Sequence, residues 1–278
     1  MARPVFLLGQ TASGKHEAAE ALADRFGMTL VSIDSMKVYR GMDIGTAKPS
    51  RPYELVDICD PGDSYNAGRF VRDARAVLAR SERPLFVGGT ALYYKALVYG
   101  MFEGPQADPE LREELSRMGA PALHRELVRV DPPAAARIHP NDLKRLVRAV
   151  EVFRKTGEPI SSKQTHFDAK PGLDAEVFVL ERGDLRERIA RRTRRMLERG
   201  LVDEVRGLLG RPWGKEGRLA VGYREVIAFL EGATGEEEME RQINRNTHTL
   251  ARHQRMWFKR LPEARAVRSV EEICDRLC

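Results

Sequence analysis

The sequence predicts an α/β protein in which helices flank a parallel sheet and a helical segment interrupts the chain. Three observations support this fold class. Short apolar runs recur at intervals long enough for a helix, a glycine-rich loop follows the first run, and about ninety residues of mainly helical pattern precede the last run. This spacing indicates parallel strands joined by helices.

Five apolar runs are the expected strands. The first covers residues 5–8 and precedes the glycine-rich loop, after which a helix is expected from Glu17. The others cover residues 30–33, 55–58, 85–87 and 176–180. Short runs rich in β-branched and aromatic side chains are typical of buried strands.

The segment before the last strand is expected to be a helical insertion. Its clearest pattern is an apolar stripe formed by Leu143, Leu146, Val147 and Val150. Turn residues stand at both edges, in the stretches 104–105 and 170–172. We therefore expect a core made of residues 1–105 and 176–278, and an insertion domain over residues 106–175.

Composition limits the class of protein. A chain of 278 residues with 42% hydrophobic residues can bury a sizeable core without metals or disulfides. Three cysteines without metal-like spacing favour free thiols in a reducing compartment. The N-terminal apolar run is too short for a signal peptide or a membrane span, so a cytoplasmic protein is expected.

The net charge of +6 is concentrated in two runs. Residues 182–199 hold eight arginines and three acidic residues, and residues 241–260 hold six Lys or Arg and no acidic residue. Each run predicts a basic helix, and a solvated helix face is the alternative to an anion-binding one. Trp257 and Phe258 lie among the cations of the second run, a combination that suits unpaired bases of RNA.

The sharpest motif is the stretch 9–16, which nearly fits the phosphate-loop pattern G-x-x-x-x-G-K-[ST]. In such a loop backbone amides surround an anion, a helix N-terminus adds partial positive charge and a lysine adds a full one. We therefore expect a P-loop NTPase-like core that binds a diphosphate or triphosphate, rather than an incidental glycine turn. The expected contacts are Gly9, Thr11, Ala12, Ser13, Gly14, Lys15 and His16.

The motif departs from the pattern at His16, where the usual hydroxyl residue would ligate Mg²⁺. This departure weakens the prediction of a kinase or a nucleoside-triphosphate hydrolase. Mg²⁺ stays an expected cofactor at a weakened site, and its ligands are not assigned.

A second motif follows the expected second strand and contains Asp34. Ligands of open α/β sheets bind outside the carboxyl ends of the strands, so Asp34 is expected at the reaction site. The alternative is that Asp34 only caps a turn or a helix.

Six segments carry a resemblance to a known family: GQTASGKH, SIDSMKVYRGMDIGTAKP, GGTALYYKAL, ARIHPNDLKRLVRAVEVF, AVGYRE and ARHQRMWFKR. They occur in the order and context seen in bacterial tRNA dimethylallyltransferases. The motifs DSM-x-VYRGMDIGTAKP and RIHPND-x-x-R are much more specific than the phosphate loop alone. The chain resembles this family over nearly its whole length.

The resemblance implies transfer of a dimethylallyl group from its diphosphate to the N6 amine of the adenosine immediately 3′ of the anticodon. Asp34 would accept a hydrogen bond or a proton from that amine. Lys15 and the amides of residues 11–16 would stabilise the departing diphosphate. Thr90 matches a position near the target nucleotide, with a helix N-cap as its alternative role.

The resemblance also implies a tRNA-facing surface. Its expected members are Asp34, Ser35, Met36, Lys37, Thr90, Arg112, Lys144, Arg145, Arg148, Arg252, Arg255 and Lys259. Arg224, and with less support Arg188 or Arg192, could instead reach the diphosphate. Lys37 stands where the family pattern has Gln, and His253 with Met256 interrupts the pattern K-R-Q-x-T-W-F-R.

The expected partners are the anticodon stem-loop of tRNA and dimethylallyl diphosphate, with a monomeric chain and no membrane. Two rival functions remain open. A small-molecule or nucleotide kinase would share the phosphate loop, and the missing hydroxyl at His16 counts against it. A non-catalytic RNA-binding protein would explain the basic helices, and the presence of Lys15 and Asp34 counts against it.

Overall fold

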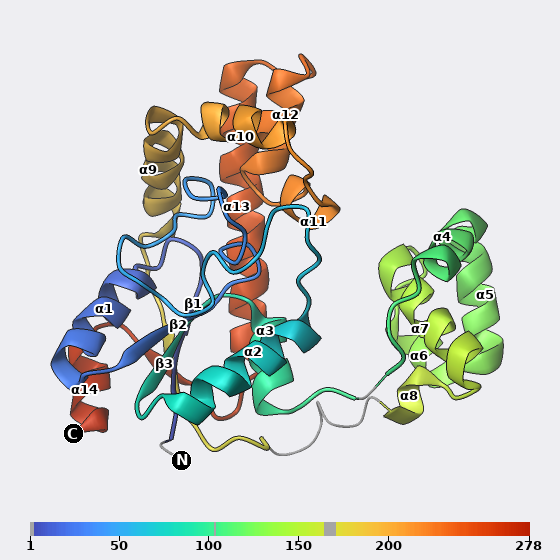
Figure 1. Ribbon diagram of the computed structural model, residues 1–278, viewed down its shortest axis with the longest axis horizontal. Coiled ribbons are helices and arrows are strands. Elements are labelled where there is room, and N and C mark those ends of the chain that lie inside the picture. Colours follow the sequence, from blue (N-terminus) through green and yellow to red (C-terminus); the bar gives the residue numbers. More distant parts are fainter. Residues whose placement is uncertain (1–2, 103, 164–170) are drawn as a thin grey trace. The chain divides into compact units, whose positions relative to one another are not determined.

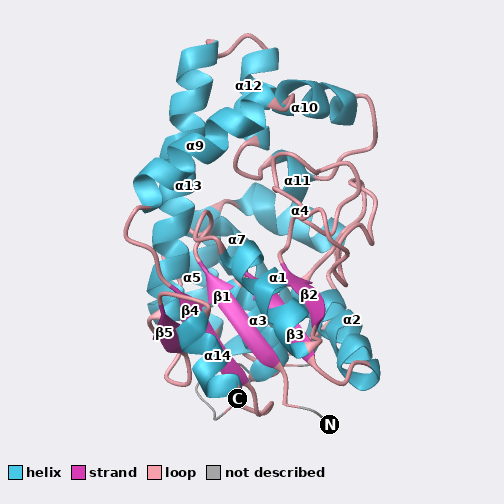
Figure 2. Cartoon of the chain, turned by 90° about the vertical axis from the view of Figure 1, so that its left-hand side faces the viewer, coloured by secondary structure: helices cyan, strands magenta, loops and turns pink. Residues whose placement is uncertain are grey.

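The computed structural model describes residues 3–102, 104–163 and 171–278, and its central element is a five-stranded sheet (Figure 2). All neighbouring strands are parallel, in the order β2-β3-β1-β4-β5. The strands are β1 (Val5–Gly9), β2 (Thr29–Ile33), β3 (Pro84–Gly88), β4 (Glu176–Leu180) and β5 (Arg265–Val267). The predicted fold class is confirmed.

Both faces of the central strand are buried, which explains its continuous apolar run. Phe6 stacks on Phe86 of β3 with ring centroids 4.9 Å apart and meets the edge of Tyr94 in α3 (Ala91–Val98). Leu7 points to the opposite face and belongs to the core that α1 (Lys15–Phe26) and α14 (Glu271–Leu277) share with the sheet. Helix α13 (Glu236–Phe258) also contacts β1.

One expected strand is absent from the sheet. The run 55–58 makes no ladder, and its neighbour Glu54 forms only an isolated parallel bridge to Val31. Leu55 and Asp57 have φ angles of 64° and 55°, in the left-handed region that breaks the pleat of a strand. The prediction of a strand at 55–58 is therefore wrong, and β5 was not predicted because three residues carry little pattern.

The chain divides into two compact units. One comprises Met1–Leu97 and Asp174–Cys278 and contains the sheet; the other comprises Val98–Leu173. These limits lie near the expected 105 and 176, and the assignment of functional domains stays a prediction. Lys170, in one of the expected turns, lies outside the described residues.

The second unit is helical and has its own apolar core (Figure 1, green and yellow helices). Leu146, Val147 and Val150 of the predicted stripe are buried in that core. Asp108, Asp131 and Asp142 cap three of the helices through side-chain oxygens. The helices are α4 (Pro109–Met118), α5 (Ala120–Val130), α6 (Pro132–Arg137), α7 (Leu143–Thr156) and α8 (Ile160–Lys163).

In the first unit, the predicted basic runs form two long helices that pack against each other, α9 (Leu185–Glu198) and α13. The remaining helices of this unit are α2 (Ala67–Arg80), α10 (Leu201–Leu209), α11 (Lys215–Arg218) and α12 (Tyr223–Leu230), of which α12 also packs on α13. Across the described residues, no helix is both long and apolar enough to cross a membrane.

Candidate active site

The phosphate-loop motif joins the end of β1 to the start of α1. Ala12 and Gly14 have φ angles of 62° and 83°, so the loop uses two left-handed residues to turn from the strand into the helix. At Gly9 an added Cβ would lie 2.8 Å from the Ser13 hydroxyl oxygen, which explains the first glycine. The structure therefore brings the seven predicted loop residues together: Gly9, Thr11, Ala12, Ser13, Gly14, Lys15 and His16.

Side chains from distant elements hold this loop from outside. Arg182 and Arg188 donate to the carbonyl oxygens of Ser13 and Ala12, over 3.3 Å and 2.7 Å. Gln254 of α13 accepts from the backbone N–H of Thr11 over 2.8 Å. These bonds fix the loop without occupying the side-chain hydroxyl of Ser13. That buried oxygen has no hydrogen-bond partner within the described part of the chain.

Asp34 follows β2 and shapes the turn after it. Its Oδ1 accepts from the backbone N–H groups of Met36 and Lys37, over 2.8 Å and 3.3 Å. This is the turn-capping role that the sequence left open. No hydrogen bond to Oδ2 is found among the described residues, so the half-buried carboxylate keeps an acceptor for a ligand.

Thr90 follows β3 and reaches the Asp34 turn. Its hydroxyl oxygen accepts from the backbone N–H of Ser35 over 3.2 Å. Neighbouring atoms lie too close to the two glycines before Thr90 for either to carry a side chain. A Cβ added at Gly88 would lie 2.2 Å from the Ile33 carbonyl oxygen, and one added at Gly89 would lie 2.3 Å from Gln254 Nε2. The sequence GGT therefore lets β2, β3 and α13 meet beside the phosphate loop.

The long loop after Asp34 is held at its far end by a carboxylate. Glu204 accepts from the backbone N–H groups of residues 43–45 and from the Tyr223 hydroxyl. Lys48 binds the Tyr39 carbonyl oxygen and pairs with Asp43 and Asp57. The segment that carries Lys37 is thus anchored before any ligand arrives.

Positive charge converges on the site. Burial, assisted by the charge of Arg192 and opposed by that of Asp34, lowers the pKa of Lys15 to about 8. Burial also lowers the pKa of Lys37 to about 7, with Asp34 again opposing the shift and the charges of Lys15 and Arg192 adding to it. Burial also lowers the pKa of Arg192, while the charge of Asp34 raises it. Buried cations beside one carboxylate are an arrangement suited to a polyanionic ligand, which would restore their protonation.

His16 lies inside this cluster. Its Nε2 lies 2.9 Å from Lys37 Nζ, and its Nδ1 lies 3.4 Å from the Tyr53 hydroxyl oxygen. Burial and the charges of Lys37, Lys15 and Arg192 hold the pKa of His16 well below its ordinary value, so its imidazole is neutral. Among the described residues, no group of three or more His, Cys, Asp or Glu could hold a metal ion.

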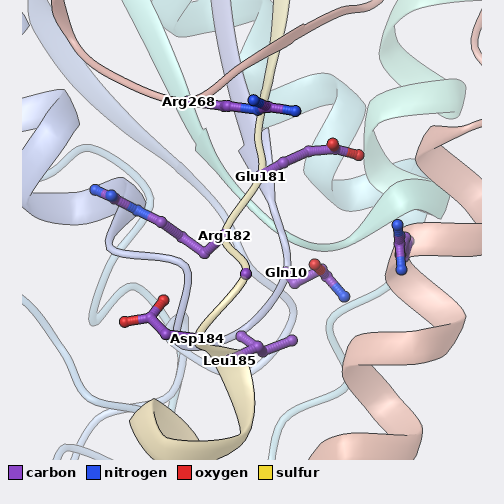
Figure 3. A pocket seen from close by; sticks show the side chains of 8 residues that line it. Gln10, Glu181, Arg182, Asp184, Leu185 and Arg268 are labelled. Atoms are coloured by element: carbon purple, nitrogen blue, oxygen red, sulfur yellow. The ribbon is translucent and has the colours of Figure 1, made fainter.

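A cavity of about 750 Å³ opens beside the phosphate loop on the β4 and β5 side (Figure 3). Asp34 and Thr90 follow β2 and β3, on the other side of β1, so the cavity is not where these two residues meet. Figure 3 shows Arg268 and Glu181 at one end of the cavity and Asp184 and Leu185 at the other. Arg182 and Arg255 also line the cavity, so it is a candidate binding site for anionic groups.

Comparison with known proteins decides the family. The family model described as IPP transferase matches residues 37–261. The chain belongs to the IPP transferase family. A relative named tRNA dimethylallyltransferase, from Thermotoga petrophila, is 45% identical over 271 residues, covering 92% of this chain and 89% of the relative. The resemblance identified from the sequence motifs is confirmed, and the chain is a transferase.

Solved structures agree with this assignment. The tRNA isopentenylpyrophosphate transferase of Bacillus halodurans matches with a TM-score of 0.73 and 32% identity, over 100% of this chain and 96% of that one. A eukaryotic dimethylallyltransferase acting on tRNA matches with a TM-score of 0.78 at 22% identity, over 98% of this chain and 75% of that one. At that identity the second match shows the fold alone.

Other predicted site residues of this IPP transferase family member lie farther along the chain. Arg252 and Arg255 are exposed on α13, and Lys259 is exposed directly after its last residue. Arg255 also lines the cavity. Trp257 is exposed beside them, whereas Phe258 is buried in the interior and is not available to a base. Arg224, on α12, pairs with Glu225 over 2.6 Å, so its guanidinium already has a partner.

The second unit holds the remaining predicted tRNA contacts. Arg112 and Arg148 both bind the buried carboxylate of Glu151, so they have a structural role whether or not they also contact RNA. Lys144 and Arg145 are exposed at the start of α7, where Arg145 pairs with Asp142. The role of these four residues toward tRNA stays a prediction.

Three residues of the site were not predicted from the sequence or had little support there. Gln254 joins the phosphate loop to β3, since it also donates to the Gly89 carbonyl oxygen over 3.0 Å. Gln10 donates to the Ala251 carbonyl oxygen over 2.9 Å. Arg192 had weak support, although its fourth-residue spacing from Arg188 places both on one side of α9 and was a usable signal.

Proposed function

We propose that the chain transfers a dimethylallyl group from dimethylallyl diphosphate to the N6 amine of the adenosine immediately 3′ of the anticodon in tRNA. The observation that carries this proposal is that a cationic phosphate loop after β1 and a carboxylate acceptor after β2 lie at the same edge of the sheet, with β3 between the two strands. The family supports the substrates: curated relatives are named tRNA dimethylallyltransferases. The charge of Asp34 raises the pKa of Lys15, which supports a shared site for the two groups.

The diphosphate is proposed to bind the loop of residues 9–16. Lys15, with 7% of its surface exposed, lies at the N-terminus of α1, where helix amides and the ammonium attract the same anion. The unpartnered Ser13 hydroxyl is a further donor. Arg192 is half-buried beside Asp34 and Lys15, and no hydrogen bond or ion pair of its guanidinium is found in the described residues. We add Arg192 to the proposed diphosphate contacts, ahead of Arg224.

Asp34 is proposed to receive the amine. As the amine nitrogen bonds to the dimethylallyl carbon, the carbon–oxygen bond to diphosphate breaks, and the departing negative charge falls on the loop cations. The amine proton passes toward Asp34, whose Oδ2 has no partner in the described chain. Thr90 is a proposed positioning residue, because its hydroxyl holds the turn that carries Asp34.

The tRNA is proposed to contact α13 through Arg252, Arg255 and Lys259, and the second unit through Lys144 and Arg145. Cations of this kind neutralise backbone phosphates, and the exposed Trp257 offers a face on which an unpaired base can stack. Lys95 lies over the Trp257 ring, 5.3 Å from its centroid, and adds charge there. A monomeric state and a cytoplasmic location stay predictions.

Of the predicted ligands, Mg²⁺ has the least support from the site. A phosphate loop binds Mg²⁺ through a hydroxyl after the lysine, and Mg²⁺ prefers oxygen ligands in octahedral geometry. Here that position is a neutral imidazole whose Nε2 faces an ammonium nitrogen. These residues do not fit the ion, and no step of the proposed reaction passes through it.

The proposal is tested by separating chemistry from RNA binding. Asp34→Asn keeps an oxygen for the turn and removes the carboxylate, so we expect tRNA affinity to persist while transfer falls by about 10²- to 10⁴-fold. Asp63→Asn is the matched control: it alters an exposed turn carboxylate that accepts from the Asp60 N–H, and transfer should be unchanged. Full activity in Asp34→Asn would remove Asp34 from the chemistry.

A further inference from the structure

Two of the departures from the family pattern, His16 and Lys37, are in contact. His16 replaces the hydroxyl residue of the phosphate loop, and Lys37 stands in the following motif where Gln is expected. Their side chains are 21 residues apart in sequence, yet Lys37 Nζ lies 2.9 Å from His16 Nε2. The two unusual residues are therefore in contact at the position where a phosphate loop usually binds its metal ion, and we expect them to act together.

The hydrogen bonds define what each group does. A neutral imidazole carries one proton, and we assign it to Nδ1, which faces the Tyr53 hydroxyl oxygen at 3.4 Å. Nε2 then accepts from Lys37, and Lys37 also donates to the Ala47 carbonyl oxygen over 2.7 Å. An ammonium group has three donors. The third has no acceptor among the hydrogen bonds of the described residues.

The surroundings of Lys37 are those of a ligand site. Only 2% of the residue is exposed, and its charge interacts with those of Lys15, Arg192 and Asp34. Burial lowers its pKa to about 7, so the ligand-free site holds this proton weakly. A bound polyanion would raise the pKa of Lys37 again and keep the ammonium charged.

We propose that the Lys37 ammonium, held by His16 and the Ala47 carbonyl, is a built-in cation that binds the diphosphate at the place where phosphate loops use Mg²⁺. This inference rests on the proposed function and concerns how the same site neutralises its leaving group. When the carbon–oxygen bond breaks, the electron pair stays on the diphosphate, and the charges of Lys15 and Lys37 stabilise it. Diphosphate binding and transfer should therefore not require a divalent ion.

The first test uses the native chain and inorganic diphosphate as the probe. Isothermal titration calorimetry with EDTA should detect binding, and added Mg²⁺ should leave the affinity nearly unchanged. Transfer of labelled dimethylallyl groups to tRNA should likewise continue in EDTA. If diphosphate binds only with Mg²⁺, or if transfer stops in EDTA, the built-in cation is refuted, although the proposed function stands. Diphosphate binding without transfer to tRNA under any metal condition would count against the proposed function instead.

Substitutions then test the roles of Lys37 and His16 in diphosphate binding. Lys37→Gln should weaken diphosphate binding in EDTA by about 10- to 100-fold, the scale of one hydrogen bond to a charged group. The double variant His16→Thr with Lys37→Gln restores the usual pattern, so added Mg²⁺ should recover its affinity. Two results together would assign Lys37 a purely structural role. They are a Lys37→Gln variant with the native affinity for diphosphate, and a double variant whose diphosphate affinity does not rise when Mg²⁺ is added.

Lys48→Gln is the matched control for a structural effect. Lys48 is another lysine of the same loop, with 7% of its side chain exposed, and its ammonium already pairs with Asp43 and Asp57. The substitution should lower the melting temperature, because two carboxylates lose their partner, without creating any dependence of diphosphate affinity on Mg²⁺. An equal gain of Mg²⁺ dependence in Lys48→Gln would show that disturbing the loop is sufficient, and would contradict the assignment to Lys37.

Discussion

Gln254 shows how a single amide can organise this site. Its oxygen accepts from the Thr11 N–H of the phosphate loop, and its nitrogen donates to the Gly89 carbonyl beside Thr90. It thereby couples the diphosphate side of the site to the strand end that positions Asp34. Because these groups are partly buried, loss of the amide leaves both a donor and an acceptor without their protein partner.

We predict that Gln254→Leu lowers the free energy of unfolding by about 1–3 kcal/mol and weakens diphosphate binding. The side chain keeps its size but can no longer satisfy the Thr11 N–H or the Gly89 carbonyl. Chemical denaturation and calorimetric titration with diphosphate would measure the two effects. The control is Gln242→Leu on the same helix, which loses only a bond to Glu238 and should leave diphosphate affinity intact.

At the scale of the element, α13 combines a buried face with a cationic one. Met239, Ile243, Ala251 and Phe258 are buried, while Arg241, Arg245, Arg252 and Arg255 are exposed. The same helix supplies Gln254 to the phosphate loop, so the proposed RNA contacts on its surface and the proposed diphosphate contacts at the loop would share one rigid support. This arrangement argues that a solvated face alone does not explain the basic run.

Arg255→Ala should weaken tRNA binding and reduce its salt dependence. Each phosphate that a cation neutralises contributes about 0.7–0.9 to the slope of log affinity against log salt, so removing this guanidinium should lower the slope by about that amount. Filter binding at several salt concentrations would measure it. Arg241→Ala, at the other end of α13 and paired with Glu238, should keep the slope. An unchanged slope in Arg255→Ala would exclude Arg255 from the RNA surface.

At the scale of the whole molecule, each unit carries its own core, and the helical unit also depends on a buried ion cluster. Burial would raise the pKa of the Glu151 carboxyl, but hydrogen bonds from Arg112, the Asp108 N–H and Arg148 hold it below its ordinary value. A carboxylate of this kind stabilises the folded state above its unfolded pKa, and that contribution is lost as pH falls through the folded pKa.

Glu151→Gln should therefore destabilise the protein at neutral pH by about 1.5–3 kcal/mol, since both arginines lose their anionic acceptor. Below about pH 4.3, the ordinary pKa of Glu, the difference from the native chain should shrink. Unfolding followed between pH 7 and pH 3 would measure both. Glu113→Gln, which alters an exposed pair with Arg117, should have little effect at any pH. A difference for Glu151→Gln that stays constant with pH would contradict this account.

The sequence could predict what depends on local pattern. The strand, loop and helix around Lys15 follow from glycine and lysine spacing over a few residues, and the family follows from long motifs such as that after Asp34. The prediction of a strand at 55–58 was wrong because apolar composition does not reveal the left-handed backbone of Leu55 and Asp57. Helix start and end residues shifted slightly as well, with α1 beginning at Lys15 rather than Glu17.

Contacts between residues that are far apart in the sequence could not be predicted. Gln254 meets Thr11 across 243 positions, and no local rule pairs an amide in a basic helix with a phosphate loop. His16 and Lys37 were each recognised as departures, but only the fold brings their nitrogen atoms together. The predicted roles of individual site residues stay predictions until the variants are measured.

The proposed function is tested by the transfer of the labelled group from radiolabelled dimethylallyl diphosphate to unmodified tRNA, measured beside ATP hydrolysis. We expect label to enter the tRNA at the N6 amine of the adenosine immediately 3′ of the anticodon, Asp34→Asn to reduce this labelling strongly, and ATP not to be hydrolysed. Steady ATP turnover with no label in tRNA, with or without Mg²⁺, would contradict the proposed function and indicate a kinase-like enzyme.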